Sequence, residues 1–366
     1  MAPLGAAAVD RVSDFWQGRR VFVTGHTGFV GGWLALSLVR RGARVTGYAL
    51  PPPTNPSFHT AIGLDRLVDG IEGDVRDLPG LTKALADAKS EIVMHLAAQP
   101  IVRRAYDDPV ETFSTNVMGT VCLMQAMRGI ESLRAAIIMT TDKVYESREW
   151  LWGYREDDRL GGREPYGVSK ACAELVVDAF RHSYIVDGYR RVGIATVRAG
   201  NVIGGGDFAL DRLVPDAVRA FSQSRPLQLR NPKAVRPWQH VLDPVAGILS
   251  LAERLCEAPD VYAGSWNVGP PEADAKPVAW IADCLASSWG EGATWILAEG
   301  AHPYEARHLA LNSTKAFVEL GWRPSWDTET TLDRSVAWYK AHLNGRNDMR
   351  GISLDQIDAH VACRSN

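Results

Sequence analysis

Residues 21–34, VFVTGHTGFVGGWL, form the stretch that decides the fold of this chain. An apolar run leads into glycines at 25, 28 and 31, and apolar residues with helical spacing follow. Gly25 is suited to a tight turn, Gly28 to close approach of backbone N–H groups to a diphosphate, and Gly31 to tight helix–strand packing. An ordinary strand–turn–helix is the alternative. The place of this stretch at the start of a βαβ pattern favours a dinucleotide site, with the diphosphate at the helix N-terminus.

Strand and helix patterns alternate from this stretch to about residue 200. The strand signals are near-continuous apolar runs, as parallel strands buried on both faces require, at 20–24, 44–48, 67–72, 92–96, 135–140 and 193–197. Helical patterns between them include 110–127 and 167–184. The alternation predicts an α/β fold, a Rossmann-type doubly wound parallel sheet with ligands outside the carboxyl ends of its strands. Residues 97–99 (AAQ) and 140–143 (TTDK) follow two of these strands.

Tyr166 and Lys170 lie four residues apart in a predicted helix. That spacing places both side chains on one helix face. An ammonium beside a phenol stabilises the phenolate, so the pair is suited to taking a proton from an alcohol whose carbon gives up a hydride. The pair alone is weak evidence, because two common residues often meet at this spacing. It gains weight from the dinucleotide pattern upstream.

The G-x-x-G-x-x-G spacing together with Tyr-x-x-x-Lys is typical of the short-chain dehydrogenase/reductase superfamily. Over roughly residues 15–340 the chain resembles an extended branch of it, the CDP-glucose 4,6-dehydratase family. The resemblance is carried by TTDKVYE, EPYGVSKACAEL, RAGNVIGGGDFALDRLVPD and RNPKAVRPWQHVLDP. The Asp142-Lys143 pair is the specific mark, since the similar dTDP-glucose dehydratases carry Asp-Glu there.

The resemblance implies an enzyme that oxidises carbon 4 of a nucleotide-bound glucose, eliminates water across carbons 5 and 6, and returns the hydride to carbon 6. Tyr166 with Lys170 would deprotonate the carbon-4 hydroxyl, which Thr141 would align. Elimination needs an acid and a base: Asp142 is assigned as the acid and Lys143 as the base. Lys143 acting only to orient Asp142 or to stabilise the enolate is the alternative. Structural roles remain open too: Thr141 as a turn cap and Asp142 as a helix N-cap.

The resemblance also implies the binding residues. For the cofactor these are Tyr166 and Lys170 with Gly25, His26, Thr27, Gly28, Phe29, Gly31, Asp74, Val75, Ala97, Ala98, Gln99 and Asn116. For the substrate they are Arg103, Asn201, Arg212, Arg230, Asn231, Arg236 and His240. Arg236 is the first choice to grip the diphosphate, because guanidinium groups bind such anions through paired hydrogen bonds.

Several of these residues have structural alternatives. Asn116 is as consistent with a buried amide whose hydrogen bonds are satisfied as with a role near Lys170. Arg103 and Arg104 are as consistent with a solvated surface as with a clamp near the sugar. For Trp238 we predict core packing in preference to base stacking, and for His95 a core position in preference to a catalytic role. The preference for a cytosine base depends on the resemblance alone.

Two departures concern the cofactor. Position 30, usually Lys in this family, is Val30, which removes a cation near the phosphates. The end of the second predicted strand, residues 47–51 (GYALP), has no acidic residue to bind a ribose 2′-hydroxyl and repel a 2′-phosphate. NAD is still predicted, because the family shows the same pattern and uses NAD, and NADP is not excluded.

The 366 residues suit two lobes. We predict an NAD-binding domain over 15–200 plus about 235–267, a smaller substrate lobe over 201–234 and 268–345, and a C-terminal appendage over 346–366. A net charge of −3 and the lack of a long apolar segment predict no nucleic-acid or membrane partner. Five scattered cysteines predict reduced thiols and no metal site.

The charged residues near the N-terminus argue against a signal peptide, so the chain is predicted to be cytoplasmic. From the family we expect a homodimer, a nucleotide-sugar substrate and a role in deoxysugar biosynthesis such as lipopolysaccharide O-antigen. A 4-epimerase would not need Asp142-Lys143, and a net-oxidising dehydrogenase would not need the Arg-rich second lobe. A non-catalytic dinucleotide sensor would be expected to lack Tyr166, Lys170 or Thr141.

Overall fold

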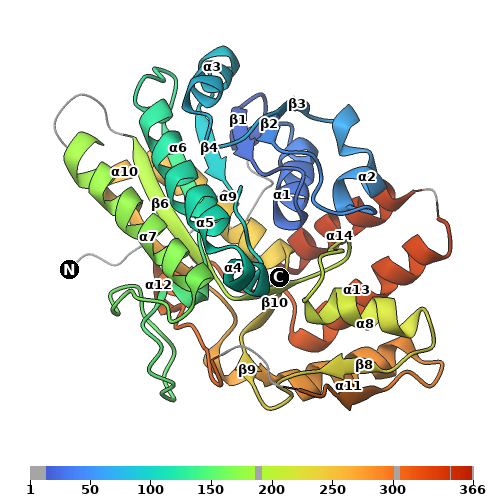
Figure 1. Cartoon of the computed structure of the whole chain (residues 1–366). Helices are drawn as coiled ribbons and strands as arrows, with labels where there is room; N and C mark the ends of the chain where they lie inside the picture. Colours follow the sequence, from blue (N-terminus) through green and yellow to red (C-terminus); the bar gives the residue numbers. More distant parts are fainter. Residues whose placement is uncertain (1–13, 186–191, 301–305, 347, 365–366) are drawn as a thin grey trace.

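The computed structural model describes residues 14–185, 192–300, 306–346 and 348–364 (Figure 1). Its centre is a sheet of seven parallel strands in the order β11-β6-β5-β4-β1-β2-β3. The strands are β1 (Arg20–Thr24), β2 (Arg44–Ala49), β3 (Asp69–Glu72), β4 (Ile92–His95), β5 (Ala135–Met139), β6 (Gly193–Ala199) and β11 (Gly264–Val268). The order reverses between β1 and β4, which confirms the predicted doubly wound sheet and places its ligand crevice at that reversal.

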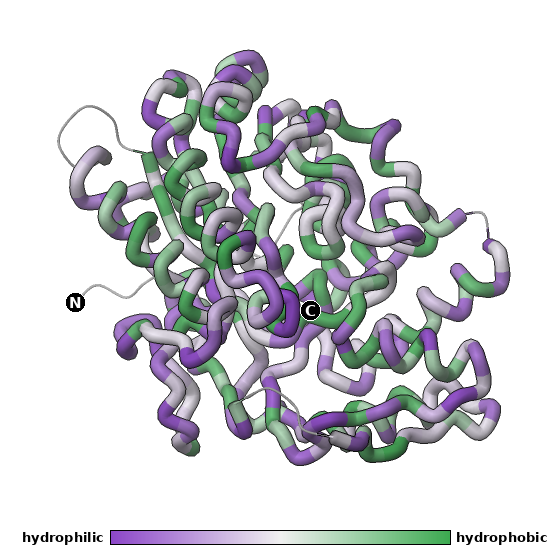
Figure 2. Tube along the Cα trace, in the orientation of Figure 1, coloured by the Kyte–Doolittle hydropathy of each residue, from purple (hydrophilic) through white to green (hydrophobic). Residues whose placement is uncertain are grey.

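Helices cover both faces of the sheet, because successive strand residues point to opposite sides. Phe22 of β1 packs in one cluster with side chains of α3 (Leu78–Ala88), α6 (Gly119–Met127) and α7 (Pro165–Phe180). Its neighbours Val21 and Val23 pack in the other, with α1 (Phe29–Arg40) and α9 (Leu242–Glu257). Hydrophobic and hydrophilic residues accordingly alternate along the helices (Figure 2).

The predicted helix over 110–127 consists of α5 (Pro109–Phe113), a π-helical turn (Ser114–Met118) and α6. Helix α7 begins two residues earlier than predicted, at Pro165. The Glu164 carboxylate accepts hydrogen bonds from the backbone N–H groups of Tyr166 and Gly167, both at 2.7 Å. This N-cap satisfies donors that have no partner in the helix and fixes the turn that carries Tyr166.

The later part of the chain forms short two-stranded sheets and helices beside the carboxyl ends of the main strands. The pairs are β7 (Asn201–Ile203) with β10 (Trp238–His240), β9 (Val235–Arg236) with β12 (Lys276–Pro277), and β8 (Leu227–Leu229) with β13 (Trp295–Leu297). The helices are α8 (Leu213–Phe221), α10 (Pro259–Tyr262), α11 (Val278–Trp289), α12 (Thr314–Glu319) and α13 (Thr328–Leu343). Two short helices precede them, α2 (Phe58–Ile62) and α4 (Val102–Asp107).

The segment expected as a C-terminal appendage contains α14 (Met349–Arg364), which packs against α13, α2 and α1. His360 Nε2 lies 2.8 Å from Asp243 Oδ1, and both side chains are buried. Trp338 donates a hydrogen bond to Ser353 Oγ at 3.0 Å. The helix is therefore part of the core of the fold and is not peripheral, because its buried face completes polar contacts that α9 and α13 cannot make alone.

Replacing His360 should measurably destabilise the protein. Among the described residues, His360→Ala leaves the buried Asp243 carboxylate with only the Ser325 backbone N–H at 2.9 Å. We expect a loss of about 2–4 kcal/mol in the free energy of unfolding. Urea denaturation measures it. The control is Asp358→Asn on the same helix, which removes an exposed ion pair with Arg40 and should cost under about 1 kcal/mol. Equal losses in the two variants would contradict the buried role of His360.

Candidate active site

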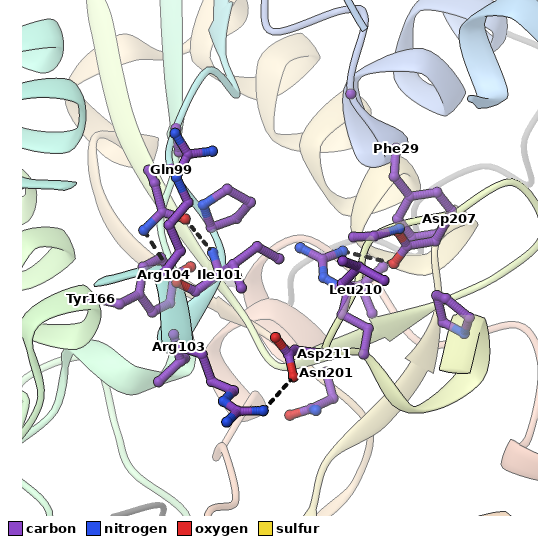
Figure 3. A pocket seen from close by; sticks show the side chains of 18 of the residues that line it. Phe29, Gln99, Ile101, Arg103, Arg104, Tyr166, Asn201, Asp207, Leu210 and Asp211 are labelled. Atoms are coloured by element: carbon purple, nitrogen blue, oxygen red, sulfur yellow. Dashed lines mark hydrogen bonds and ion pairs between the residues drawn. The ribbon is translucent and has the colours of Figure 1, made fainter. Parts of the chain in front are cut away.

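A cavity of about 1610 Å³ lies at the carboxyl ends of β1, β4, β5 and β6. Its volume exceeds the roughly 300–1,000 Å³ usual for one drug-sized ligand. One end is lined by the glycine-rich turn after β1 and the other by residues of α8, β8 and β9. Figure 3 shows Tyr166, Gln99 and Arg103 on one side facing Asn201, Asp207 and Asp211 on the other. Two ligands can therefore share this space.

The turn after β1 is a cradle that only glycine can form. Gly25 has φ +74°, and a Cβ there would lie 2.6 Å from the backbone N of Ala97. A Cβ on Gly31 would lie 2.1 Å from the carbonyl oxygen of Gly25. Gly28 is the N-cap of α1 and makes no side-chain cap, so the first N–H groups of that helix face the cavity end. The residues present fit a dinucleotide diphosphate.

Filling this cradle should weaken cofactor binding. Gly31→Ala forces the turn at Gly25 to shift. Overpacking of this kind costs about 1–3 kcal/mol, and the same loss of binding free energy would raise the dissociation constant of the cofactor roughly 5- to 150-fold. Titration of intrinsic fluorescence with NAD would measure it. Gly129→Ala is the matched control, since a Cβ there meets no atom within 4 Å. Unchanged affinity in Gly31→Ala would mean that the turn does not hold the diphosphate.

The cavity end near β2 has no carboxylate on that strand. Leu50, Pro51 and Val30 line it, and Thr27 donates a hydrogen bond to the Leu50 carbonyl at 2.9 Å. Asp74, after β3, also lines it, and hydrogen bonds from the Arg76 guanidinium hold the pKa of that carboxyl below its usual value. The sequence lacked an acidic residue at the end of β2 and a cation at position 30 of α1, and this ion pair places one of each at this end of the cavity.

Two of the predicted cofactor residues do not line the cavity. The His26 ring lies against Gly47, where a Cβ would meet it at 2.5 Å, and burial lowers its pKa to about 4. Asn116 is buried behind Gln99: its Oδ1 accepts from the Gln99 N–H at 2.8 Å, and its Nδ2 donates to Ser169 Oγ at 2.9 Å. His26 is thus a neutral packing residue, and Asn116 positions Gln99 and α7. The other predicted cofactor residues line the cavity: Gly25, Thr27, Gly28, Phe29, Gly31, Asp74, Val75, Ala97, Ala98, Gln99, Tyr166 and Lys170.

The structure brings Thr141, Lys143, Tyr166 and Lys170 to one wall of the cavity. Lys170 Nζ donates to the Met139 carbonyl at 3.1 Å. Burial raises the pKa of Tyr166 to about 12, and a Thr141 hydrogen bond and the Arg212 charge oppose this effect. The predicted lowering of the phenol pKa by Lys170 is therefore not found in the protein alone, because burial outweighs the nearby cations. Burial also lowers the pKa of Lys170 to about 8.

Asp142 lies one layer behind these residues. Its side chain is fully buried and does not line the cavity. Oδ1 accepts from Thr141 Oγ1 at 3.0 Å and lies 3.6 Å from Lys143 Nζ. Oδ2 is buried without a hydrogen-bond partner among the residues that the structure describes. Lys143, in contrast, reaches the cavity. The two expected acid–base residues thus form one pair of which only Lys143 faces the ligand space, and Thr141 also caps the short 3₁₀ turn Asp142–Val144.

On the substrate side, six of the seven predicted residues line the cavity: Arg103, Asn201, Arg212, Arg230, Asn231 and Arg236. His240 does not. It is fully buried between Trp33 and Trp326 and accepts a hydrogen bond from the Leu242 N–H at 3.2 Å. His240 therefore belongs to the core at the start of α9. Trp238 donates to the Lys276 carbonyl and is buried, in agreement with a packing role.

Several carboxylates that line the cavity were not predicted from the sequence, Asp211 and Asp207 among them. Asp211 Oδ1 lies 2.9 Å from both Arg103 and Arg230, and so bridges α4 and the residue after β8 (Figure 3). Asp207 pairs with Arg212 at 2.8 Å. Both occur in the segment GGGDFALDRL, where the closeness of Asp207 to Arg212 was an available signal. The arginine partners of Asp211 lie far away in the sequence and cannot be assigned without the fold.

Burial also determines the pKa of His95, another titratable group near the site. His95 is fully enclosed between the hydroxyl groups of Thr24 and Thr120, and burial lowers its pKa to about 3. It is thus a core residue, as predicted. No group of three or more His, Cys, Asp or Glu side chains suited to a metal occurs among the described residues. None of the helices described is long and apolar enough to cross a membrane.

Comparison with known proteins agrees with this geometry. Residues 21–269 match the model of the NAD dependent epimerase/dehydratase family. The chain is 49% identical over 352 residues to the CDP-glucose 4,6-dehydratase of Salmonella typhimurium, covering 95% of this chain and 98% of that protein. A dTDP-glucose 4,6-dehydratase of Xanthomonas campestris is 27% identical over 93% of this chain and 99% of that protein.

Solved structures show the same fold. The UDP-glucose 4-epimerase of Thermotoga maritima with UDP-glucose has a TM-score of 0.76 at 21% identity. MoeE5 in complex with UDP-glucose and NAD has a TM-score of 0.75 at 24% identity. Both cover 88% of this chain and 99% of their own. The family model spans more than half of the chain and agrees with the glycine cradle and the Tyr166–Lys170 pair. This chain belongs to the NAD dependent epimerase/dehydratase family.

Proposed function

We propose that this enzyme converts CDP-glucose to CDP-4-keto-6-deoxyglucose with NAD as a recycled cofactor. The observation that carries the proposal is the meeting of two pairs at one cavity wall: Tyr166 with Lys170, and Lys143 with Asp142 behind it. The first pair suits oxidation at carbon 4 and the second suits elimination of water. The 49% identity to a CDP-glucose 4,6-dehydratase supports the choice of reaction and base.

In this proposal each residue of the wall acts on a defined atom. Thr141 aligns the carbon-4 hydroxyl, and Tyr166 takes its proton. NAD, when bound, supplies the hydride acceptor, the later hydride donor and a positive charge that favours the phenolate. Since Asp142 does not contact the cavity, Asp142 and Lys143 act as one acid–base pair. Lys143, as a neutral amine, takes the proton of carbon 5. As an ammonium whose charge Asp142 balances, it then gives a proton to the hydroxyl that leaves carbon 6 as water.

The substrate diphosphate is assigned to the arginines of the second lobe. Arg236 is buried and, like Arg230 and Arg212, lines the cavity. Arg212 also contributes a positive charge that lowers the pKa of Tyr166. A diphosphate held here would place the glucose between these arginines and Tyr166.

The test is mass spectrometry of products after incubation with NAD and, separately, CDP-, dTDP-, UDP- or GDP-glucose. Loss of one water from CDP-glucose alone, without accumulation of NADH, is the expected result. An isomeric sugar without water loss would indicate a 4-epimerase, the activity of several relatives in fold. Net NADH would indicate a dehydrogenase. Repeating the assay with NADP tests the cofactor, since β2 ends without a carboxylate.

We further propose that the enzyme is a cytoplasmic homodimer in deoxysugar biosynthesis, including that of lipopolysaccharide O-antigen. All five cysteines are free thiols, which supports a reducing compartment.

The dimer is supported by exposed apolar side chains on neighbouring elements, which suit a self-association surface: Val110 of α5, Met118 of the π-helical turn and Leu175 of α7. Sedimentation analysis of the parent and of Leu175→Glu tests the dimer, which the substitution should dissociate.

A further inference from the structure

Glu174 is a buried carboxylate next to the catalytic helix face that the proposed reaction does not use. It lies on α7 one turn after Lys170, is 3% exposed and does not line the cavity. Its Oε1 accepts from Thr140 Oγ1 at 2.5 Å. Its Oε2 accepts from Arg198 Nη2 at 2.8 Å and Thr196 Oγ1 at 2.7 Å. Ser265 Oγ adds a fourth donor at 3.2 Å.

These partners connect Glu174 to the strand end that carries the reaction. Thr140 directly precedes Thr141 and leads into Asp142 and Lys143. The Lys170 ammonium donates to the carbonyl of Met139, the residue before Thr140. Helix α7 therefore holds the end of β5 at two consecutive residues, once through Lys170 and once through Glu174.

Glu174 is also the anion that faces Lys170. Burial lowers the pKa of Lys170 to about 8, and the negative charge of Glu174 opposes that effect. Among the described residues, His95 on β4 also interacts with Lys170: burial and, second, the Lys170 charge lower its pKa and keep it neutral. Tyr166 lies one turn before Lys170 on the same face of α7. Arg198 on β6 pairs with Glu174 at 2.8 Å, and both side chains are nearly inaccessible to solvent.

We propose that Glu174 is a positioning residue of this site: it holds Lys170 as an ammonium and fixes Thr140, so that Tyr166 and Thr141 meet the carbon-4 hydroxyl in one geometry. The proposal rests on the proposed function for the step that Tyr166 and Lys170 perform. Glu174 itself contacts neither ligand. A purely structural Glu174 would stabilise the fold without influencing the protonation of Lys170.

The direct test is the titration of Lys170, followed by NMR of the protein with ¹³C-labelled lysine side chains. The Lys170 signal is identified by its absence in Lys170→Met. In Glu174→Gln the loss of the carboxylate should shift the titration midpoint of Lys170 to lower pH by about 1 unit. Asp178→Asn is the matched control, since Asp178 lies on the same helix four residues further and is exposed. It should leave the midpoint unchanged.

Glu174→Gln leaves Arg198 buried without its partner, and such a variant can fail to fold. The double variant Glu174→Gln/Arg198→Met removes both charges together, and replacing both partners costs much less than breaking the pair. We expect it to fold and still to show a Lys170 midpoint below that of the parent, because the lost Glu174 charge is the one that raises the pKa of Lys170.

The pH profile of turnover gives the second readout. Lys170 must be protonated to support Tyr166, so a lower midpoint moves the alkaline limb of kcat to lower pH, with the largest loss of activity above pH 8. A folded single or double variant in which Lys170 titrates as in the parent would overturn the proposal. If the Lys170 midpoint is shifted in the variants but the parent protein makes no dehydrated sugar, this inference is supported and the proposed function is contradicted.

Discussion

Tyr166→Phe is expected to lower turnover by at least about 10³-fold while leaving substrate and cofactor affinity within a few-fold. The phenol is the group of the cavity wall placed to take a proton, since it shares a hydrogen bond with Thr141 and lies near the Arg212 charge. Phenylalanine preserves the buried ring and removes only the hydroxyl. Without it the carbon-4 hydroxyl keeps its proton, and oxidation cannot begin.

Single-turnover absorbance of the enzyme-bound cofactor measures this prediction. No reduced nicotinamide should appear after CDP-glucose is added to the variant, although isothermal titration still detects binding. Tyr154→Phe is a suitable control, because Tyr154 also lines the cavity but its hydroxyl accepts a hydrogen bond from the Arg148 backbone N–H. Turnover near the parent rate in Tyr166→Phe would remove Tyr166 from the catalytic role.

Lys143→Met should stop the reaction after the first step. The substitution keeps the stem of the side chain and removes the amine, so carbon-4 oxidation should proceed while water loss falls by about 10²–10³-fold. Reduced cofactor and a 4-keto hexose should therefore accumulate on the enzyme. The measurement combines cofactor absorbance with mass spectrometry of the quenched mixture.

The effect of Asp142→Asn shows whether Asp142 acts through Lys143 or has a separate role in the elimination. If Asp142 acts through Lys143, as its burial and the 3.6 Å contact indicate, the variant should show the same accumulation as Lys143→Met, and the double variant should be no slower than either. Exchange of the carbon-5 proton with deuterated solvent gives a separate readout of the base. A Lys143→Met enzyme that releases dehydrated product at the parent rate would contradict this assignment.

The fold was largely predictable because its signals are local. The glycine turn, the apolar strands and helix α7 each follow from residues close in sequence, and β1 begins and ends where predicted. The last helix, α14, was not predicted as core. Its mean hydropathy is low, and it is held by contacts to partners more than one hundred residues away, such as His360 with Asp243.

The site could be predicted in part. Residues in short motifs, such as Tyr166 and Lys170, reach the cavity as expected. His240 on β10 and His26 in the turn after β1 do not, since the sequence could not show which way their side chains point. Asp211 was missed because its two arginine partners lie 108 and 19 residues away.

By itself, then, the sequence determined the order of strands and helices, the glycine cradle and the helix face shared by Tyr166 and Lys170. Each of these depends on a short period or a fixed spacing along the chain. Only the tertiary structure decided that Asp142 lies behind Lys143, that Asp211 bridges two arginines and that Lys170 and Glu174 both bond the end of β5. Those contacts join side chains from different elements, and the packing of the sheet and its helices sets which of them meet.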